Sequence, residues 1–184
     1  SHESYTYKDN ENIVRLVGGV LPRYIYWIKS ANNKQLPVEC LSFDREQEKF
    51  LNSETDHVPD YYPDLKCSWA YTINCIDPAD GKVKVLNLKK KLFAQICSAA
   101  EDMGLDPTDP DEGFDVVFKR VKTGPLAYNV EYTLSQLKLK KRALTDTERQ
   151  AVAEAKTIDE KFPRPTPAEI KTFLDKIKKR SEER

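Results

Sequence analysis

Basic and aromatic side chains are the residues of this sequence whose types and spacing could do chemistry. Basic residues gather in three runs, at 82–91, 119–122 and 138–142, and Trp69 and Tyr128 lie in or beside basic segments. Lys and Arg attract a phosphate backbone, and a ring stacked on an unpaired base contributes about 1–3 kcal/mol. A duplex hides those base faces. The pattern favours binding of single-stranded nucleic acid, although such rings are equally common in a protein core.

Residues that could support catalysis are few and scattered. The sequence has two His and none of the motifs GxSxG, P-loop, GxGxxG or HExxH. An acidic run at 101–115 contains no Lys or Arg, and Asp109 and Asp111 within it could in principle hold Mg²⁺ or Ca²⁺. A solvated loop is the more frequent role of such a run, and the EF-hand spacing is absent. The sequence therefore predicts a protein that is not an enzyme.

Cysteine spacing gives little support for a metal. The four cysteines are Cys40, Cys67, Cys75 and Cys97, and none belongs to a CxxC pair. His57 with Cys67 and Cys75 could be imagined as a ligand set, but structural zinc sites usually pair their ligands at short spacing. We expect free thiols of an intracellular protein, with no metal and no cofactor.

Composition limits the partners. The chain of 184 residues has 30 basic and 30 acidic residues, so its formal net charge is zero, and its mean hydropathy is −0.67. Neutrality argues mildly against nucleic acid, but segregated charge can still leave a patch that attracts a polyanion. No apolar stretch approaches the roughly 18–20 residues of a membrane span, so we expect no membrane partner.

Hydrophobic periodicity predicts a mainly β chain with helices at its end. Alternating or β-branched runs, bounded by turn residues, predict strands, and Gly18-Gly19 is expected to end the first of them. An apolar face repeating at three and four residues predicts a helix over 89–103 that stops at Gly104. Capping boxes at Thr145 and Thr166 predict two further helices. The expected strands are 13–17, 24–28, 38–43, 69–76, 83–88, 114–121, 130–134 and 137–139; a short helix is expected within 44–51 and irregular chain over 56–64.

This order predicts a mainly β, OB-fold-like five-stranded barrel with an added subdomain and C-terminal helices, an α+β fold. The core is expected over 1–142, with an insert at 44–66, and a helical C-terminal extension is expected over 143–184. Adjacent Tyr61 and Tyr62 in the insert have two interpretations of equal weight: packing on the barrel, or contact with a ligand.

Two sequence stretches carry a family resemblance. The first reads Trp69-Ala70-x-x-Ile73-x-x-x-Asp77-Pro78, then Gly81-Lys82-Val83, then Lys90-Lys91-Leu92-Phe93-x-x-Ile96, and the second is a Val/Lys-rich strand from Phe118 followed by Gly124 and Tyr128. In these stretches the chain resembles the core of the single-stranded-DNA-binding (helix-destabilising) proteins of T-even-type phages. The order of elements agrees from about residue 11 to 140.

The resemblance implies an OB-fold that holds single-stranded DNA in a cleft of Lys, Arg and Tyr, without catalysis, during phage DNA replication, recombination and repair. The host cell cytoplasm is the implied location. Phage replication and recombination proteins, and further copies of the chain along the DNA, are the implied partners. By position, Trp69, Tyr128, Lys90 and Lys91 match family residues. The complete set of expected DNA-binding residues is Lys66, Trp69, Tyr71, Lys82, Lys90, Lys91, Lys119, Arg120, Lys122, Tyr128, Tyr61 and Tyr62.

Departures from the family concern its zinc subdomain and its arms. Only Cys40 stands at a matching zinc-ligand position, so the zinc site is expected to be lost and the insert to be held by packing of Phe50, Tyr61 and Tyr62. Leu86 and Pro125 occupy two positions that are aromatic in the family. The family's basic N-terminal arm and acidic C-terminal tail are not visible in this sequence.

Two other function classes remain open. A protein-interaction or virion-structural β-barrel that binds no nucleic acid is favoured by the neutral net charge. A small metal-dependent enzyme, such as a nuclease, would reveal itself by turnover. Weakening of binding by salt distinguishes nucleic-acid contact from both.

Overall fold

The structure is a computed structural model that describes residues 2–182, and the chain folds into two compact units. Unit 1 contains the N-terminal segment up to Leu21 together with Tyr71–Lys161. Unit 2 contains Pro22–Ala70 and the C-terminal segment that begins at Phe162. Strands β1 (Asn10–Lys29) and β5 (Ser68–Asp77) each contribute residues to both units. The division into a core over 1–142 and an extension over 143–184 stays a prediction.

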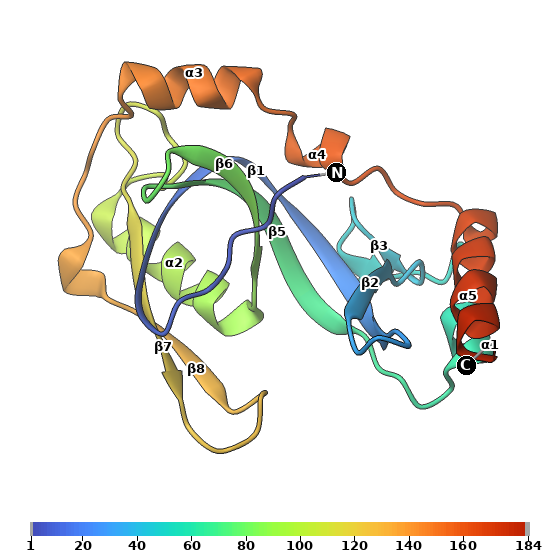
Figure 1. The fold of residues 1–184 in the computed structure, drawn as a ribbon. Coiled ribbons are helices and arrows are strands. Elements are labelled where there is room, and N and C mark those ends of the chain that lie inside the picture. Colours follow the sequence, from blue (N-terminus) through green and yellow to red (C-terminus); the bar gives the residue numbers. More distant parts are fainter. Residues whose placement is uncertain (1, 183–184) are drawn as a thin grey trace. The chain divides into compact units, whose positions relative to one another are not determined.

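One antiparallel sheet organises the strands in the order β6-β5-β1-β7-β8, with β2 paired to β1 (Figure 1). The remaining strands of this sheet are β2 (Gln35–Glu39), β6 (Lys82–Leu88), β7 (Val116–Lys122) and β8 (Val130–Leu134). Helix α2 (Lys90–Met103) follows the β5–β6 hairpin, and further helices follow β8. This arrangement fits an OB-like α+β fold, so the predicted fold class is confirmed.

Strand β1 continues through Gly18 and Gly19, the two glycines that were expected to end it. Gly18 adopts a φ of +76°, which a glycine reaches without the steric cost of a Cβ, and a strand can bend there without ending. The N-terminal part of β1 pairs with β7 over 10–14, and its C-terminal part pairs with β2 over 25–29. The expectation of two separate strands over 13–17 and 24–28 was therefore wrong.

The core of unit 1 forms where α2 packs on the sheet. The predicted apolar face is present, because Leu92, Ile96 and Ala99 are buried, and Gly104 ends the helix in the left-handed conformation. These side chains pack with buried residues of β1, β5, β6 and β7. Full burial of each large aliphatic side chain contributes about 1.5–3 kcal/mol, so this contact fixes α2 against the sheet.

Helices α3 (Asp146–Glu154) and α4 (Ile158–Lys161) complete unit 1. Thr145 and Glu148 form the predicted capping box at the start of α3. Glu148 also accepts a hydrogen bond of 2.7 Å from Arg142, whose guanidinium donates to Asp115 at 2.8 Å as well. This ion pair holds the beginning of α3 beside the segment that precedes β7.

Unit 2 has its own small core. Ile170, Leu174 and Ile177 of α5 (Pro167–Glu182) are buried against residues that include Tyr26, Val38 and Leu41. A two-stranded sheet, β3 (Phe43–Asp44) with β4 (Lys49–Phe50), and the one-turn helix α1 (Val58–Tyr61) belong to this unit as well. The amphipathic face predicted for the last helix is thus used within unit 2.

Three local expectations were wrong. The segment 44–51 forms the β3–β4 hairpin instead of a helix, and Glu48 in its turn takes a φ of +51° that no helix interior allows. The segment 56–64 contains α1, because Pro59 stands in a first turn, where its missing N–H costs nothing. The last expected strand, 137–139, is instead a 3-10 turn over Gln136–Lys138.

No helix within residues 2–182 is long and apolar enough to cross a membrane. Over the same residues, no group of three or more His, Cys, Asp and Glu side chains is placed to hold a metal ion.

Candidate nucleic-acid interface

The β7–β8 hairpin carries four of the predicted residues: Lys119, Arg120, Lys122 and Tyr128. Lys119 pairs with Thr133 and Arg120 with Tyr132 across the hairpin. Because side chains alternate along a strand, Lys119 lies on one face, and Arg120 and Lys122 lie on the other. Lys119 and Lys122 are exposed, whereas Arg120 is half-buried. The hairpin therefore presents positive charge on both faces, and it projects from the rest of unit 1 (Figure 1).

Arg120 is positioned by two neighbours. Its guanidinium donates to Asp9 at 2.7 Å and to the Tyr132 hydroxyl at 3.4 Å. These hydrogen bonds, the one with Tyr132 first, raise the pKa of Arg120 above its ordinary value. The Tyr132 ring in turn lies 5.0 Å from that of Tyr7, centroid to centroid. The charge of Arg120 is thus held in a defined direction at the base of the hairpin.

The tip of the hairpin is ordered by its own backbone. Thr123 donates to the Asn129 carbonyl at 2.9 Å, and Asn129 donates to the Leu126 carbonyl at 2.9 Å. The Asn129 side chain accepts from the Leu126 N–H at 3.1 Å and packs against Gly124, where an added Cβ would lie 2.7 Å from its Oδ1. The tip thus holds its shape by backbone and amide contacts and leaves the Tyr128 ring 76% exposed.

The first turn of α2 is a second basic feature of unit 1. Lys89 is its N-cap residue without a side-chain cap hydrogen bond, and the turn contains Lys90 and Lys91 but no acidic residue. The N-terminus of a helix carries partial positive charge, so lysines there add to a field that attracts anions and slightly destabilise the free helix. Lys91 lies 3.7 Å from Glu131 of β8, which places this turn beside the hairpin.

The other two predicted residues of unit 1 lie in different surroundings. Tyr71 stacks on Phe93 with ring centroids 3.7 Å apart and an angle of 11°, so one face of its ring is covered by α2. Lys82 is exposed at the turn between β5 and β6, opposite Asp77. It stands at the far end of β6 from Lys90 and is not brought next to the hairpin.

The remaining predicted residues belong to unit 2. Trp69 is half-buried, and its ring lies 4.7 Å from Tyr24 and 5.3 Å from Phe43, edge to face in both cases. The Tyr61 hydroxyl donates a hydrogen bond to the Asp175 carboxylate of α5, and the Lys178 ammonium of α5 lies 4.7 Å from the centre of the Tyr62 ring.

These aromatic residues of unit 2 thus take part in its packing. Phe50 has the same role, since its ring lies 4.7 Å from Tyr24 and 5.3 Å from Phe43, although it is 49% exposed. Lys66 is exposed.

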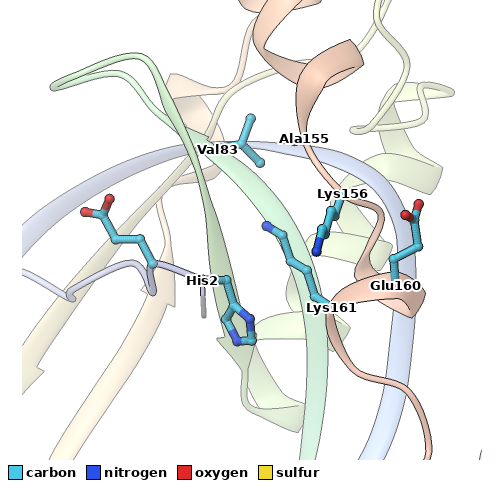
Figure 2. A pocket seen from close by; sticks show the side chains of 7 residues that line it. His2, Val83, Ala155, Lys156, Glu160 and Lys161 are labelled. Atoms are coloured by element: carbon cyan, nitrogen blue, oxygen red, sulfur yellow. The ribbon is translucent and has the colours of Figure 1, made fainter.

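A hollow of about 350 Å³ in unit 1 contains none of the predicted residues. Figure 2 shows its lining, in which Lys156 and Lys161 come from the C-terminal side of α3 and from α4. Lys161 donates to Asn74 Oδ1 at 2.7 Å, and burial lowers its pKa. Glu3 and Glu160 line the same hollow, so its charges are mixed and it offers no clear preference for an anion.

The cysteine at the family's zinc-ligand position has a neighbouring thiol. Hydrogen bonding with Cys67 lowers the pKa of Cys40 to about 7, with further help from Tyr26, against the opposing effect of burial. The Cys40 sulfur also lies 3.5 Å from the Asp56 carboxylate. None of the four cysteines forms a disulfide within the described residues.

Lys138, Lys140 and Lys141 are surface residues that the sequence prediction left out of its set. They line a groove on unit 1 together with Glu11 and Ile13. The run of basic residues at 138–142 was visible in the sequence. What the sequence could not show is that the segment after β8 lies beside β1, where Lys138 is 2.8 Å from Glu11, because these two residues are 127 positions apart.

The fold and this surface together define a mainly β, OB-like protein with a basic hairpin tipped by an exposed tyrosine. Over 136 residues the chain is 30% identical to a probable ssDNA-binding protein of Escherichia phage T5, a match that covers 67% of this chain and 51% of that protein. The chain thus spans about half the length of the curated relative it matches. No protein-family model matches the chain. The similarity supports the predicted resemblance to phage proteins of this class but does not single out the T-even-type branch.

Proposed function

We propose that this protein binds single-stranded DNA without sequence preference, through lysine and arginine contacts with phosphates and through stacking of bases on exposed rings. The observation that carries the proposal is Tyr128, a tyrosine ring 76% exposed on a hairpin that also presents Lys119 and Lys122. An exposed ring beside lysines suits an unpaired base next to its phosphate. The printed name of the phage T5 relative supports the same class of ligand.

The number of basic side chains sets the expected salt dependence of the affinity for single-stranded DNA. Five basic side chains lie at the hairpin and the first turn of α2: Lys90, Lys91, Lys119, Arg120 and Lys122. To contact phosphate, Lys91 would have to exchange Glu131 for it, and Arg120 would have to exchange Asp9. At about −0.7 per phosphate contact on single strands, five contacts give a slope of about −3.5 for log K against log salt. Affinity would then fall on the order of 100-fold between 50 and 200 mM salt.

The proposed biological setting follows from the resemblance to single-stranded-DNA-binding proteins of phages. A non-enzymatic, sequence-independent binder of this kind would cover single strands during phage DNA replication, recombination and repair in the host cytoplasm. Phage replication and recombination proteins would be its protein partners, and neighbouring copies could assemble along one strand. Trp69, Tyr71, Lys66, Lys82, Tyr61 and Tyr62 stay in the proposed set. The four aromatic residues among them are half-buried, so they would meet DNA only with the ring surface that their packing leaves exposed.

The test is a titration of fluorescein-labelled oligo(dT), oligo(dA) and a duplex of equal length, followed by anisotropy at about 50 and 200 mM salt. We expect binding of both single strands, weakening with salt, and much weaker binding of the duplex. Equal affinity for duplex and single strand would contradict the stacking argument. Absence of binding to all three would favour the alternative of a protein-interaction module.

A further inference from the structure

A groove of about 490 Å³ lies on unit 1, outside the set of residues discussed under the proposed function. Its lining includes Glu11 and Ile13 of β1, Asp115 and Val117 at the start of β7, and the lysines Lys138, Lys140 and Lys141. Ile13 pairs with Val117 and Glu11 with Lys119, so these four side chains share one face of the sheet. Val116 and Phe118, on the opposite face, belong to the core of unit 1. Ile13 and Lys119 are exposed although Val117 between them is buried, so the groove lies on the face of the sheet opposite Phe118.

The lysines of the groove are held loosely. Lys138 lies 2.8 Å from Glu11, and Lys141 lies 3.9 Å from Glu112, with all four side chains between 44% and 66% exposed. Exposed pairs of this kind contribute little to stability and exchange readily with another anion. Lys140 is exposed as well. The ammonium groups of Lys138 and Lys141 can therefore exchange their carboxylate partners for phosphates without a loss of folded structure.

Arg142 differs from these lysines although it lines the same groove. It donates to Asp115 at 2.8 Å and to Glu148 at 2.7 Å. Its guanidinium already binds two carboxylates that position the start of α3. We therefore assign Arg142 a structural role in the wall of the groove and do not count it as a phosphate ligand.

The face of the sheet that carries the groove is continuous with the hairpin. Lys119 and Val121 follow Val117 on the same face of β7, and Val121 is 45% exposed. Beyond them comes the tip that carries Tyr128. Lysines and exposed aliphatic side chains thus line one path from the groove to the tip, a combination that suits a chain of phosphates and sugars.

We propose that the groove is an extension of the binding surface, which takes the sugar–phosphate backbone of a longer single strand, with Lys138, Lys140 and Lys141 as its phosphate ligands. This inference rests on the proposed function and adds to it a dependence of affinity on strand length. A strand of about 6 nucleotides is expected to occupy the hairpin alone, and one of about 16 to reach the groove, within the range known for one OB-fold.

The first test is the double substitution Lys140→Gln with Lys141→Gln, measured by anisotropy with oligo(dT) of about 6 and about 16 nucleotides. Lys176→Gln with Lys179→Gln is the matched control, because it removes the same charge from exposed positions of α5. We expect the groove variant to lose affinity only for the longer strand, with a salt slope smaller by about 1.4. The control variant should keep both affinities and the slope.

The second test is a gain of affinity. Glu11 competes with phosphate for Lys138, so Glu11→Gln should tighten binding of the longer strand by up to about five-fold, the upper value of an exposed pair. Glu46→Gln, at an exposed position of the β3–β4 turn, is its control and should change nothing. Thermal unfolding of all four variants should match that of the original chain, because every changed side chain is exposed.

Each result bears on one of the two proposals. Equal effects of the groove and control variants on the longer strand, or a groove variant that weakens both strands equally, overturn the groove assignment and leave the hairpin site intact. Failure of the unsubstituted chain to bind either strand overturns the proposed function, and the groove assignment with it.

Discussion

Substitution of Tyr128 gives the sharpest test of the proposed binding mode, because this side chain contributes little to the stability of the fold. The side chain is 76% exposed. A tyrosine buries about 150–250 Å² when fully enclosed, so the quarter that is covered amounts to about 50 Å². At about 25 cal/mol per Å², Tyr128→Ala should lower the free energy of unfolding by about 1 kcal/mol at most. If the ring stacks on a base, the same change removes about 1–3 kcal/mol of binding free energy, or about 5- to 150-fold in affinity.

The assay combines an oligo(dT) titration with urea unfolding of the same preparations. Since stacking involves no charge, the loss of affinity should be the same at low and high salt, with an unchanged slope. Tyr128→Phe should keep the affinity, because the ring and not the hydroxyl makes the contact. Phe173→Ala is the matched control, since Phe173 is a 38% exposed ring on α5. Affinity within two-fold of the original for Tyr128→Ala, or an equal loss for the control, would refute the reasoning.

Three other changes have distinct signatures. Lys90→Glu with Lys91→Glu should weaken oligo(dT) binding mainly at low salt and reduce the slope by about 1.4, while unfolding shows no loss of stability, because carboxylates suit a helix N-terminus. Glu148 has its pKa lowered to about 2, mainly by its hydrogen bond with an arginine. Ionised Glu148 therefore contributes about 1–2 kcal/mol to the free energy of unfolding after allowance for solvent screening. This contribution should be complete above pH about 4.5 and should disappear as pH falls through 2. In urea unfolding, Glu148→Gln should therefore be less stable than the original chain at pH 6 but equally stable near pH 2. Gly124→Ala places a Cβ 2.7 Å from Asn129 Oδ1 and should weaken oligo(dT) binding through the tip while leaving the melting temperature nearly unchanged; unchanged affinity would show that the shape of the tip is unimportant.

Elements with local signals were predictable from the sequence. The hairpin of β5 and β6 follows from alternation and a strong turn signal, and α2 follows from its apolar repeat and Gly104. The start of α3 follows from the capping box at Thr145. Each of these depends on residues close together in the sequence, which is why the pattern was sufficient.

Elements that depend on distant pairing were not predictable. A glycine pair normally ends a strand, yet β1 continues through Gly18. Its residues 10–14 pair with β7 and its residues 25–29 pair with β2, so strand pairing is present on both sides of the glycines. The candidate site shows the same limit. Tyr61 and Tyr62 form contacts with α5, more than a hundred residues away, and only the structure shows that Tyr128 remains exposed while Trp69 packs on Tyr24.

The neutral net charge, which first argued against a nucleic-acid ligand, has a different meaning once the ion pairs are known. Arginines are largely used inside the fold: Arg45 and Arg164 both bind the buried carboxylate of Glu39, and Arg142 binds Asp115 and Glu148. A fork-shaped guanidinium suits such fixed, two-pronged contacts, whereas a lysine ammonium stays strongly hydrated and adaptable.

The carboxylates of Glu39, Asp115 and Glu148 are therefore neutralised where they hold the structure together. Lysines such as Lys90, Lys119, Lys122 and Lys140 remain exposed on one unit. A phosphate chain at this surface could therefore meet exposed lysines that have no carboxylate partner within 4 Å among residues 2–182, although the sum of charges over the chain is zero. The proposed ligand therefore depends on the positions of these lysines and not on the formal net charge.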